Sequence, residues 1–429
     1  MNVRIDRRQF LLTGVAISAA GFSARRAVAA DARLRMAWWG GKARAELTQK
    51  AIDLYVSKHP GVQVETEYLG WGDYWARLST QTSGGNSPDI VQIDIEYLAD
   101  YATRGVLLPL EPLIPKPLDV SDFQPDLLGN GKVDGKQYAV PCGVNAGALV
   151  LDKTAFDEAG VALPDHNTTW AQFESIMAEF TKRTPRKGMF GSTDASGSEA
   201  VLETWLRQRG KQLYHPDGTL AYDQTDMTGW FEMWEQMRSS GAAAPAEVEA
   251  LDHGEVDSSL LSQGKAALAF ENSNQFVAFQ SLTKDQLALA PYPKVDSNSK
   301  GGLYIKPTMF YSISSQSKNP QAAAELLDFI LRDPEATVIL GGERGVPASA
   351  SVRERLRPKM DAAGDAMVDY IDGLGDLAGT LPPPNPPGGS EVTDALIAAS
   401  QEVAFKTKTA AQGAADFVEK AKQILDRAK

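Results

Sequence analysis

Hydrophobic and polar positions follow two different periods along the first part of the chain. Residues 34–39, 62–68 and 89–94 show the alternation, or the short apolar run, that is typical of β-strands. Between them, residues 43–57 and 74–82 place apolar side chains three or four positions apart, which predicts helices. A repeated order of strand, helix and strand predicts a parallel sheet with right-handed crossovers.

The later part of the chain continues to mix the two kinds of element. A hairpin is predicted over residues 133–141, and further strands are predicted over residues 145–151, 287–291 and 309–313. Residues 262–270 are predicted to form a turn and then a strand that ends at Phe270. Thr169 is followed three residues later by Gln172, a capping-box pattern that predicts the start of a helix. The proline-rich residues 381–389 are interpreted as a loop that crosses the surface and packs against it. Two amphipathic helices follow this loop. The whole pattern predicts an α/β protein.

Aromatic, glycine and acidic residues gather where the first three predicted strands end. The segments are Trp38-Trp39-Gly40-Gly41, Gly70-Trp71-Gly72-Asp73 and Asp94-Ile95-Glu96-Tyr97. Ligands of open parallel sheets bind outside the carboxyl ends of the strands, so these segments are expected to share one crevice. Neighbouring residues of a strand point to opposite faces, so one of the two adjacent Trp rings is free to stand at the crevice.

Residues 1–30 have the pattern of an export signal. Arg7-Arg8 followed by an apolar run and a small-residue cleavage site resembles a twin-arginine signal, and the apolar run is too short for a transmembrane anchor. Its removal changes the formal net charge from −12 to −16. Such an acidic chain disfavours nucleic acid or an anionic membrane surface as a partner. The single Cys142 allows no internal disulfide, and about 400 residues suggest at least two domains.

Several segments together are similar to extracellular solute-binding proteins (family 1) of carbohydrate ABC importers. They are GGNSPDIV at residues 84–91, KAAL at 265–268 and ERGVP at 343–347, together with the order of the parallel units. The resemblance covers nearly the whole mature chain. WWGG at 38–41 and YLGW at 68–71 look most like the branch that includes oligogalacturonide binders.

The resemblance implies a two-lobed periplasmic-binding-protein fold of type II, each lobe a mostly parallel sheet flanked by helices. It implies an N-terminal lobe of residues 31–143 plus 306–350, and a C-terminal lobe of residues 144–305 plus 351–429. The lobes are expected to close like a hinge around residues 142–145, Lys306 and Arg344. A monomer is expected that delivers a sugar to a membrane permease, needs no cofactor or metal and hydrolyses nothing. No Walker A motif occurs in the chain.

A sugar site needs aromatic platforms and polar groups that bond to hydroxyls. The predicted ligand-binding residues are Trp38, Trp39, Gly40, Arg44, Trp71, Tyr74, Asp94, Glu96, Asn145, Asn272, Asn274, Lys306 and Arg344. Arg44 and Arg344 would suit an acidic, uronate-type sugar, because Arg binds carboxylates with two hydrogen bonds. Structural alternatives remain open: either Trp as core, Asp94 as a helix cap, and Tyr74 as the inner face of its helix.

Two other functions remain open at this point. Asp94 and Glu96, if both lie on one strand, would be about 6.6 Å apart along it, near the spacing of a glycosidase carboxylate pair. An exported glycosidase or lyase is therefore an alternative. A polyamine or other non-sugar binder is a second one, because carboxylates and aromatic walls suit such ligands. All four His residues lie in polar, turn-like surroundings, and no metal-binding motif occurs.

Overall fold

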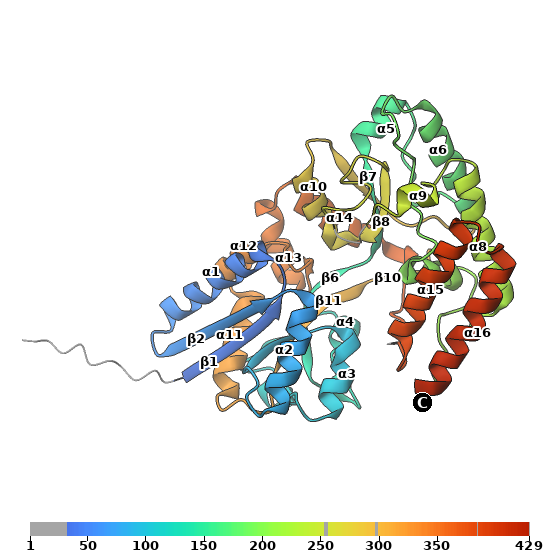
Figure 1. Ribbon diagram of the computed structural model, residues 1–429. Helices are drawn as coiled ribbons and strands as arrows, with labels where there is room; N and C mark the ends of the chain where they lie inside the picture. Colours follow the sequence, from blue (N-terminus) through green and yellow to red (C-terminus); the bar gives the residue numbers. More distant parts are fainter. Residues whose placement is uncertain (1–31, 253–255, 297–298, 384, 429) are drawn as a thin grey trace, which may run out of the picture.

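The computed structural model describes residues 32–252, 256–296, 299–383 and 385–428, so the predicted export signal lies outside the described residues. Figure 1 shows two bodies, one built mainly from the first third of the chain and the segment around α11–α13, and the other from the middle and the end of the chain. Across the described residues, no helix combines the length and the apolar character needed to cross a membrane.

The first body contains a six-stranded sheet in the order β12-β6-β11-β3-β1-β2. Its strands are β1 (Ala32–Trp39), β2 (Val62–Leu69), β3 (Ile90–Ile93), β6 (Ala139–Asn145), β11 (Lys306–Ile313) and β12 (Val346–Pro347). The predicted parallel pairing is confirmed for β2, β1 and β3. The prediction of a mostly parallel sheet is wrong for the other half, because β11 runs antiparallel to β3 and β6, and β12 runs antiparallel to β6.

Helices cover both faces of this sheet. They are α1 (Lys42–Lys58), α2 (Trp71–Ser83), α3 (Ile95–Thr103), α4 (Pro125–Gly129), α11 (Pro320–Arg332), α12 (Pro334–Leu340) and α13 (Ala350–Leu356). Strand β1 is buried on both faces, as a central strand of a covered sheet must be. Leu34, Met36 and Trp38 pack into one core, and Ala37 and Trp39 into a second core on the opposite face.

The second body has a three-stranded sheet in the order β8-β7-β9. Its strands, β7 (Gly147–Asp152), β8 (Leu268–Asn272) and β9 (Leu287–Ala290), are all antiparallel, so the expected mostly parallel sheet is wrong here too. Single parallel bridges, such as that between Phe190 and Ala266, extend it. The surrounding helices are α5 (Lys153–Ala159), α6 (Trp170–Arg183), α7 (Glu199–Arg207), α8 (Gln224–Ser239), α9 (Ala246–Glu249), α10 (Phe276–Leu282), α14 (Ala362–Gly373), α15 (Gly389–Ala404) and α16 (Ala410–Ala428).

Short elements complete the fold. They are the pairs β4 (Lys132–Val133) with β5 (Lys136–Gln137) and β10 (Leu303–Tyr304) with β13 (Ala378–Gly379), and the single-turn helices η1 (Glu111–Leu113), η2 (Ser273–Gln275), η3 (Arg357–Lys359) and η4 (Gly375–Leu377). The predicted capping box is confirmed, since Thr169 Oγ1 accepts from the Gln172 backbone N–H and Gln172 Oε1 accepts from that of Thr169.

Two strands carry the chain between the bodies. Only Ala146 separates β6 of the first sheet from β7 of the second, and only Ile305 separates β10 from β11. Lys306 lies opposite Asn145 in the β6–β11 pairing, so the two crossings lie side by side. Figure 1 shows β6, β10 and β11 at the junction of the two bodies. Such a junction, made of a few short crossing segments, is the structural requirement for hinge motion.

Candidate functional site

The three predicted loops lie at one edge of the first sheet. Trp39 lies opposite Leu69 in the β1–β2 pairing, and Ala37 lies opposite Val91 in the β1–β3 pairing. The parallel strands therefore end at similar heights, and the turn after β1, the start of α2 and the start of α3 share that edge. The central prediction from the sequence is confirmed in this respect.

Two of the predicted aromatic platforms are core residues instead. Trp38 is only 1% exposed and stacks on Tyr68 with ring centroids 6.3 Å apart. Tyr74 is buried on the inner face of α2, and its hydroxyl donates to the Gln92 carbonyl over 2.7 Å. The prediction that Trp38 and Tyr74 contact a ligand is therefore wrong, because the sheet and α2 enclose both rings.

Trp71 is the aromatic side chain that reaches the surface at this edge. It is 44% exposed and meets Trp39 edge to face, with ring centroids 5.0 Å apart. Trp75 and Tyr97, which were not among the predicted residues, stack on each other with ring centroids 3.7 Å apart, and each meets Trp71 edge to face. Trp39 is nearly buried, so its ring packs against Trp71 and offers little exposed surface to a ligand.

Gly40 and Arg44 form a close internal contact. Gly40 has a φ of +148°, and a Cβ there would lie 2.5 Å from Cδ of Arg44. Arg44 donates to the Trp39 carbonyl and to both the side chain and the carbonyl of Glu343, with Nε 3.1 Å from Glu343 Oε1. A side chain at position 40 would therefore clash with Arg44. The prediction that Gly40 and Arg44 contact a ligand is wrong for this conformation, because the two contact each other and Arg44 also pairs with Glu343.

Arg344 is likewise internal. It is 7% exposed, its Nε donates to Gln92 Oε1 at 3.2 Å, and its Nη2 donates to Thr48 Oγ1 at 2.9 Å. The prediction that Arg344 takes a ligand carboxylate is wrong for this conformation. Its guanidinium joins the β3, α1 and β12 regions beneath the sheet edge.

Asp94 caps a helix, which was the structural alternative for this residue. Asp94 Oδ1 accepts from the Glu96 backbone N–H at 3.0 Å, and α3 begins at the residue between them. Because strand β3 ends at Ile93, Asp94 and Glu96 do not occupy one strand face. The spacing on which the glycosidase alternative rested is therefore wrong.

Charges from both bodies meet at Asp94 and Glu96. Burial raises the pKa of the Asp94 carboxyl, and Lys306 acts in the opposite direction. Partial burial raises the pKa of the Glu96 carboxyl, and so do Asp94 and then Glu199, while Lys306 again opposes the shift. Lys306 begins β11, and Glu199 begins α7 of the second body, where its carboxylate accepts from Asn385 Nδ2 and Thr393 Oγ1.

Two of the three predicted amide side chains bond to each other at the crossing. Asn145 Nδ2 donates to Asn274 Oδ1 at 2.6 Å. Asn145 is 5% exposed, and its Oδ1 has no hydrogen-bond partner among the described residues. Asn272 instead begins a helical turn, and its backbone N–H donates to Gln275 Oε1. An unpaired buried carbonyl oxygen at the hinge is an acceptor that a ligand hydroxyl can use.

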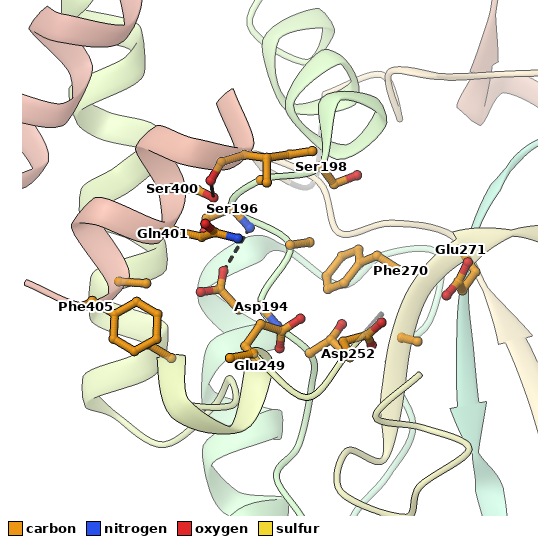
Figure 2. Close-up of a pocket in the computed structure, with 18 residues that line it drawn as sticks. Asp194, Ser196, Ser198, Glu249, Asp252, Phe270, Glu271, Ser400, Gln401 and Phe405 are labelled. Atoms are coloured by element: carbon orange, nitrogen blue, oxygen red, sulfur yellow. Dashed lines mark hydrogen bonds between the residues drawn. The ribbon is translucent and has the colours of Figure 1, made fainter. Parts of the chain in front are cut away.

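A pocket of about 470 Å³ opens in the second body (Figure 2), and the sequence reading did not find it. Asp194, Glu249 and Glu271 line it together with the ring of Phe270. Asp194 pairs with Arg238 at 2.5 Å, and its backbone N–H donates to Glu249 Oε2 at 2.9 Å. Burial raises the pKa of Glu249 to about 8 and that of Glu271 to about 7.

The pocket lies beside the predicted site in the chain and in space. Ser198 at one end of the pocket precedes Glu199, and Glu271 at the other end precedes Asn272. The available signal was that β8 ends at Asn272, a predicted site residue, whereas Glu199 at the start of α7 was not among the predicted residues. Among the described residues, no group of three or more His, Cys, Asp or Glu side chains could hold a metal ion.

Comparison with known families and structures gives a consistent result. The family of bacterial extracellular solute-binding proteins matches residues 40–337. An extracellular solute-binding protein of family 1 from Alicyclobacillus acidocaldarius is similar in structure, with a TM-score of 0.75, 30% identity, and coverage of 92% of this chain and 98% of that one.

Two further relatives have named ligands. A periplasmic oligogalacturonide binding protein from Yersinia enterocolitica, in complex with saturated digalacturonic acid, has a TM-score of 0.80, 25% identity, and coverage of 92% of this chain and 99% of that one. An arabinooligosaccharide-binding protein of Halalkalibacterium halodurans is 26% identical over 184 residues, which are 42% of this chain and 37% of the relative.

Proposed function

Since the chain belongs to the bacterial extracellular solute-binding protein family, we propose that it captures a sugar or short oligosaccharide and delivers it to the permease of an ABC importer. The observation that carries this proposal is the arrangement of the cleft. The exposed Trp71 and the carboxylates of Asp94 and Glu96 lie at the edge of the first sheet, and burial, Asp94 and then Glu199 of the second body raise the pKa of Glu96. Relatives named for sugar ligands support the class of solute.

We propose that the protein works as an exported monomer in the periplasm with two lobes that close around the hinge. The division follows the one expected from the sequence, residues 31–143 plus 306–350 against 144–305 plus 351–429, with one change at the last crossing. Helix α13 packs on the first lobe, because Arg353 donates to the Pro347 carbonyl and Arg355 to that of Arg332, so the last crossing falls after Leu356. Hinge motion then centres on residues 142–145 and Lys306.

We propose a neutral sugar rather than a uronate as the preferred ligand. The two Arg residues that would bind an acid group are engaged internally, Arg44 with Glu343 and Arg344 with Gln92 and Thr48. Lys306 is the one predicted basic contact without such an internal partner among the described residues, and its charge acts on the carboxylates of Asp94, Glu96 and Glu203. The carboxylate of a uronate ligand would come close to these protein carboxylates, and repulsion between like charges disfavours its binding.

A basic solute, such as a polyamine, remains the second candidate, because the pocket in the second body is lined by Asp194, Glu249 and Glu271. We further propose that the protein performs no chemistry on its solute. The pair Asp94 and Glu96 lacks the shared strand face on which the glycosidase alternative depended.

A thermal-shift screen tests these proposals together. The purified mature protein is melted with neutral oligosaccharides, oligogalacturonides and polyamines, and a solute at 100 times its Kd adds about 2.7 kcal/mol of stability. A shift with neutral sugars is expected. A shift with oligogalacturonides alone would reject the neutral ligand, a shift with polyamines alone would reject a sugar, and product release in the same tubes would reject a pure binding role.

A further inference from the structure

A second, smaller pocket lies inside the first body, behind strands β6 and β11. Its volume is about 40 Å³, and helices α11, α12 and α13 form its apolar wall through Leu331, Leu340 and Leu356. The opposite wall is formed by Cys142, Tyr311 and Arg344. This volume holds two or three water-sized groups, since one such group needs roughly 10–15 Å³ by this measure. A sugar ring does not fit.

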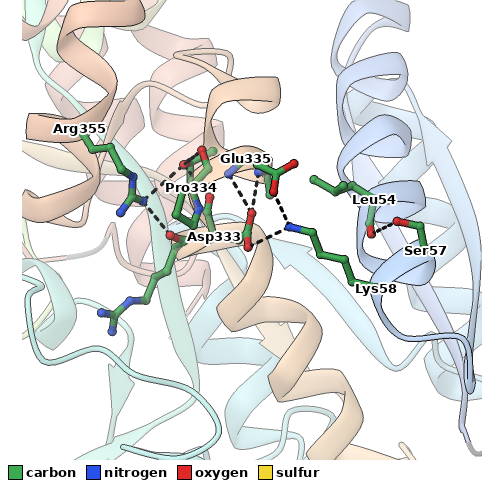
Figure 3. A network of polar contacts seen from close by, with 10 residues as sticks. Leu54, Ser57, Lys58, Asp333, Pro334, Glu335 and Arg355 are labelled. Atoms are coloured by element: carbon green, nitrogen blue, oxygen red, sulfur yellow. Dashed lines mark hydrogen bonds and ion pairs between the residues drawn. The ribbon is translucent and has the colours of Figure 1, made fainter.

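The helical wall is fixed from both sides, as Figure 3 shows. Lys58 of α1 pairs with Asp333 and Glu335 at 3.5 and 2.9 Å, at the start of α12. On the other side, Nη2 of Arg355 in α13 donates to the Arg332 carbonyl at 2.7 Å. The pocket is therefore a preformed feature of the lobe.

Its polar wall consists of hydrogen-bond donors. Arg344 Nη1 and the Tyr311 hydroxyl are buried, and apart from the contact between the Arg344 guanidinium and Tyr311, neither has a hydrogen-bond partner in the part of the chain that the structure describes. The Arg344 guanidinium lies 5.7 Å from the Tyr311 ring centroid. Burial raises the pKa of the Tyr311 hydroxyl and raises that of the Cys142 thiol to about 12, with Arg344 opposing both shifts, so both groups keep their protons at neutral pH.

Among the described residues, the charge of Arg344 has no carboxylate partner. Glu343, its neighbour in the chain, pairs with Arg44, and the partners of Arg344 itself are the neutral side chains of Gln92 and Thr48. None of the residues that line the pocket is acidic. A buried charge without a counter-charge is strongly unfavourable, so the site favours a bound group that accepts hydrogen bonds and carries a negative charge.

We propose that this pocket binds one small monovalent anion of the halide class, held by Arg344 Nη1 and the Tyr311 hydroxyl. A halide accepts from both donors, donates to neither and fits the volume with a water molecule beside it. The site is separate from the sugar cleft, but β6 and β11 carry residues of both. Halide occupancy therefore stabilises the lobe whether or not a sugar is bound.

Bromide provides the direct test with the full mature chain. Crystals soaked in sodium bromide are expected to show an anomalous peak in contact with Arg344 Nη1. In solution, the melting temperature is expected to rise and saturate with sodium chloride or bromide, relative to sodium gluconate at equal ionic strength. Equal melting curves in the three salts, or ordered water alone in the soaked pocket, would overturn the proposal.

A matched pair of variants assigns the effect to the pocket. Tyr311→Phe removes one donor and is expected to weaken halide affinity about five- to tenfold, the usual effect of losing one hydrogen bond. Tyr55→Phe removes another buried hydroxyl without a partner, outside the pocket, and is expected to leave halide affinity unchanged. Equal halide affinity in both variants would count against the site. The halide effect should persist in Trp71→Ala, which separates it from sugar binding.

Discussion

Replacement of Trp71 by Ala tests whether its exposed ring is the platform for the sugar. The side chain is 44% exposed, and an enclosed Trp buries about 250 Å², so roughly 110 Å² of the ring is open to a ligand. At about 25 cal/mol per Å², covering all of it would contribute ~2.7 kcal/mol, or about 100-fold in Kd. A sugar covers one face of a ring, so we expect about half of this, close to a tenfold loss of affinity.

Tyr68→Ala is the matched control for this substitution. Tyr68 lies near the end of β2, three residues before Trp71, and is 48% exposed. Its ring stacks on Trp38, on the other face of the sheet from Trp39. Its loss should leave sugar affinity unchanged. Trp71→Phe keeps a smaller platform and should fall between the parent protein and Trp71→Ala.

Isothermal titration calorimetry with a sugar selected by the thermal-shift screen measures these affinities. Melting curves show whether each variant is folded, because Trp71→Ala also removes the edge contacts with Trp39 and Trp75. An unchanged Kd for Trp71→Ala would remove this ring from the site. An equal loss in Tyr68→Ala would show that the effect is not specific to the cleft.

Three further substitutions give distinct results. Trp38→Ala should lower the free energy of unfolding by about 3–5 kcal/mol in denaturant titrations, because it empties a core position, and a smaller loss than 1 kcal/mol would contradict its burial. Asn145→Ala removes the hydrogen bond to Asn274 and the unpaired Oδ1, so sugar affinity by calorimetry should fall about fivefold or more, and equal affinity would place Asn145 outside the site. Burial raises the pKa of Glu249 from its usual value of 4.5 to about 8. Between these two pH values the native state keeps a proton that the unfolded chain releases, so the free energy of unfolding falls as pH rises from 5 to 8. Melting temperatures should fall less over this range in Glu249→Gln than in the control Glu247→Gln, and parallel curves would contradict the assignment.

The elements of the fold were predictable because their signals are local. The alternation in residues 34–39 and the capping box at Thr169 and Gln172 depend on a few neighbouring residues, and the structure confirms both. Strand direction was not predictable, because β11 joins β3 and β6 from more than 150 residues away in the sequence. A periodic pattern shows which face of a strand is apolar, but not which strand lies beside it.

The same limit explains the errors in the candidate site. Adjacent Trp38 and Trp39 had to point to opposite faces, but the sheet is covered on both, so neither ring became the exposed platform. Arg44 and Glu343 pair across 299 positions of sequence, and no local pattern reports such a contact. Trp71 lies at the sheet edge as expected, because it begins a helix one residue after strand β2 ends, and its role as a ligand contact stays a prediction.

The internal use of both Arg residues determines how the cleft responds to a solute. With Arg44 and Arg344 engaged beneath the sheet edge, Lys306 is the cation that opposes the effect of the Asp94 and Glu199 charges on Glu96. Repulsion between carboxylates of the two lobes favours the open state when the cleft contains only water. Under the proposed function, a ligand with several hydroxyl donors would lie between the carboxylates and satisfy them, so its binding free energy would be larger in the closed state than in the open one. That difference is what a solute needs in order to close the lobes.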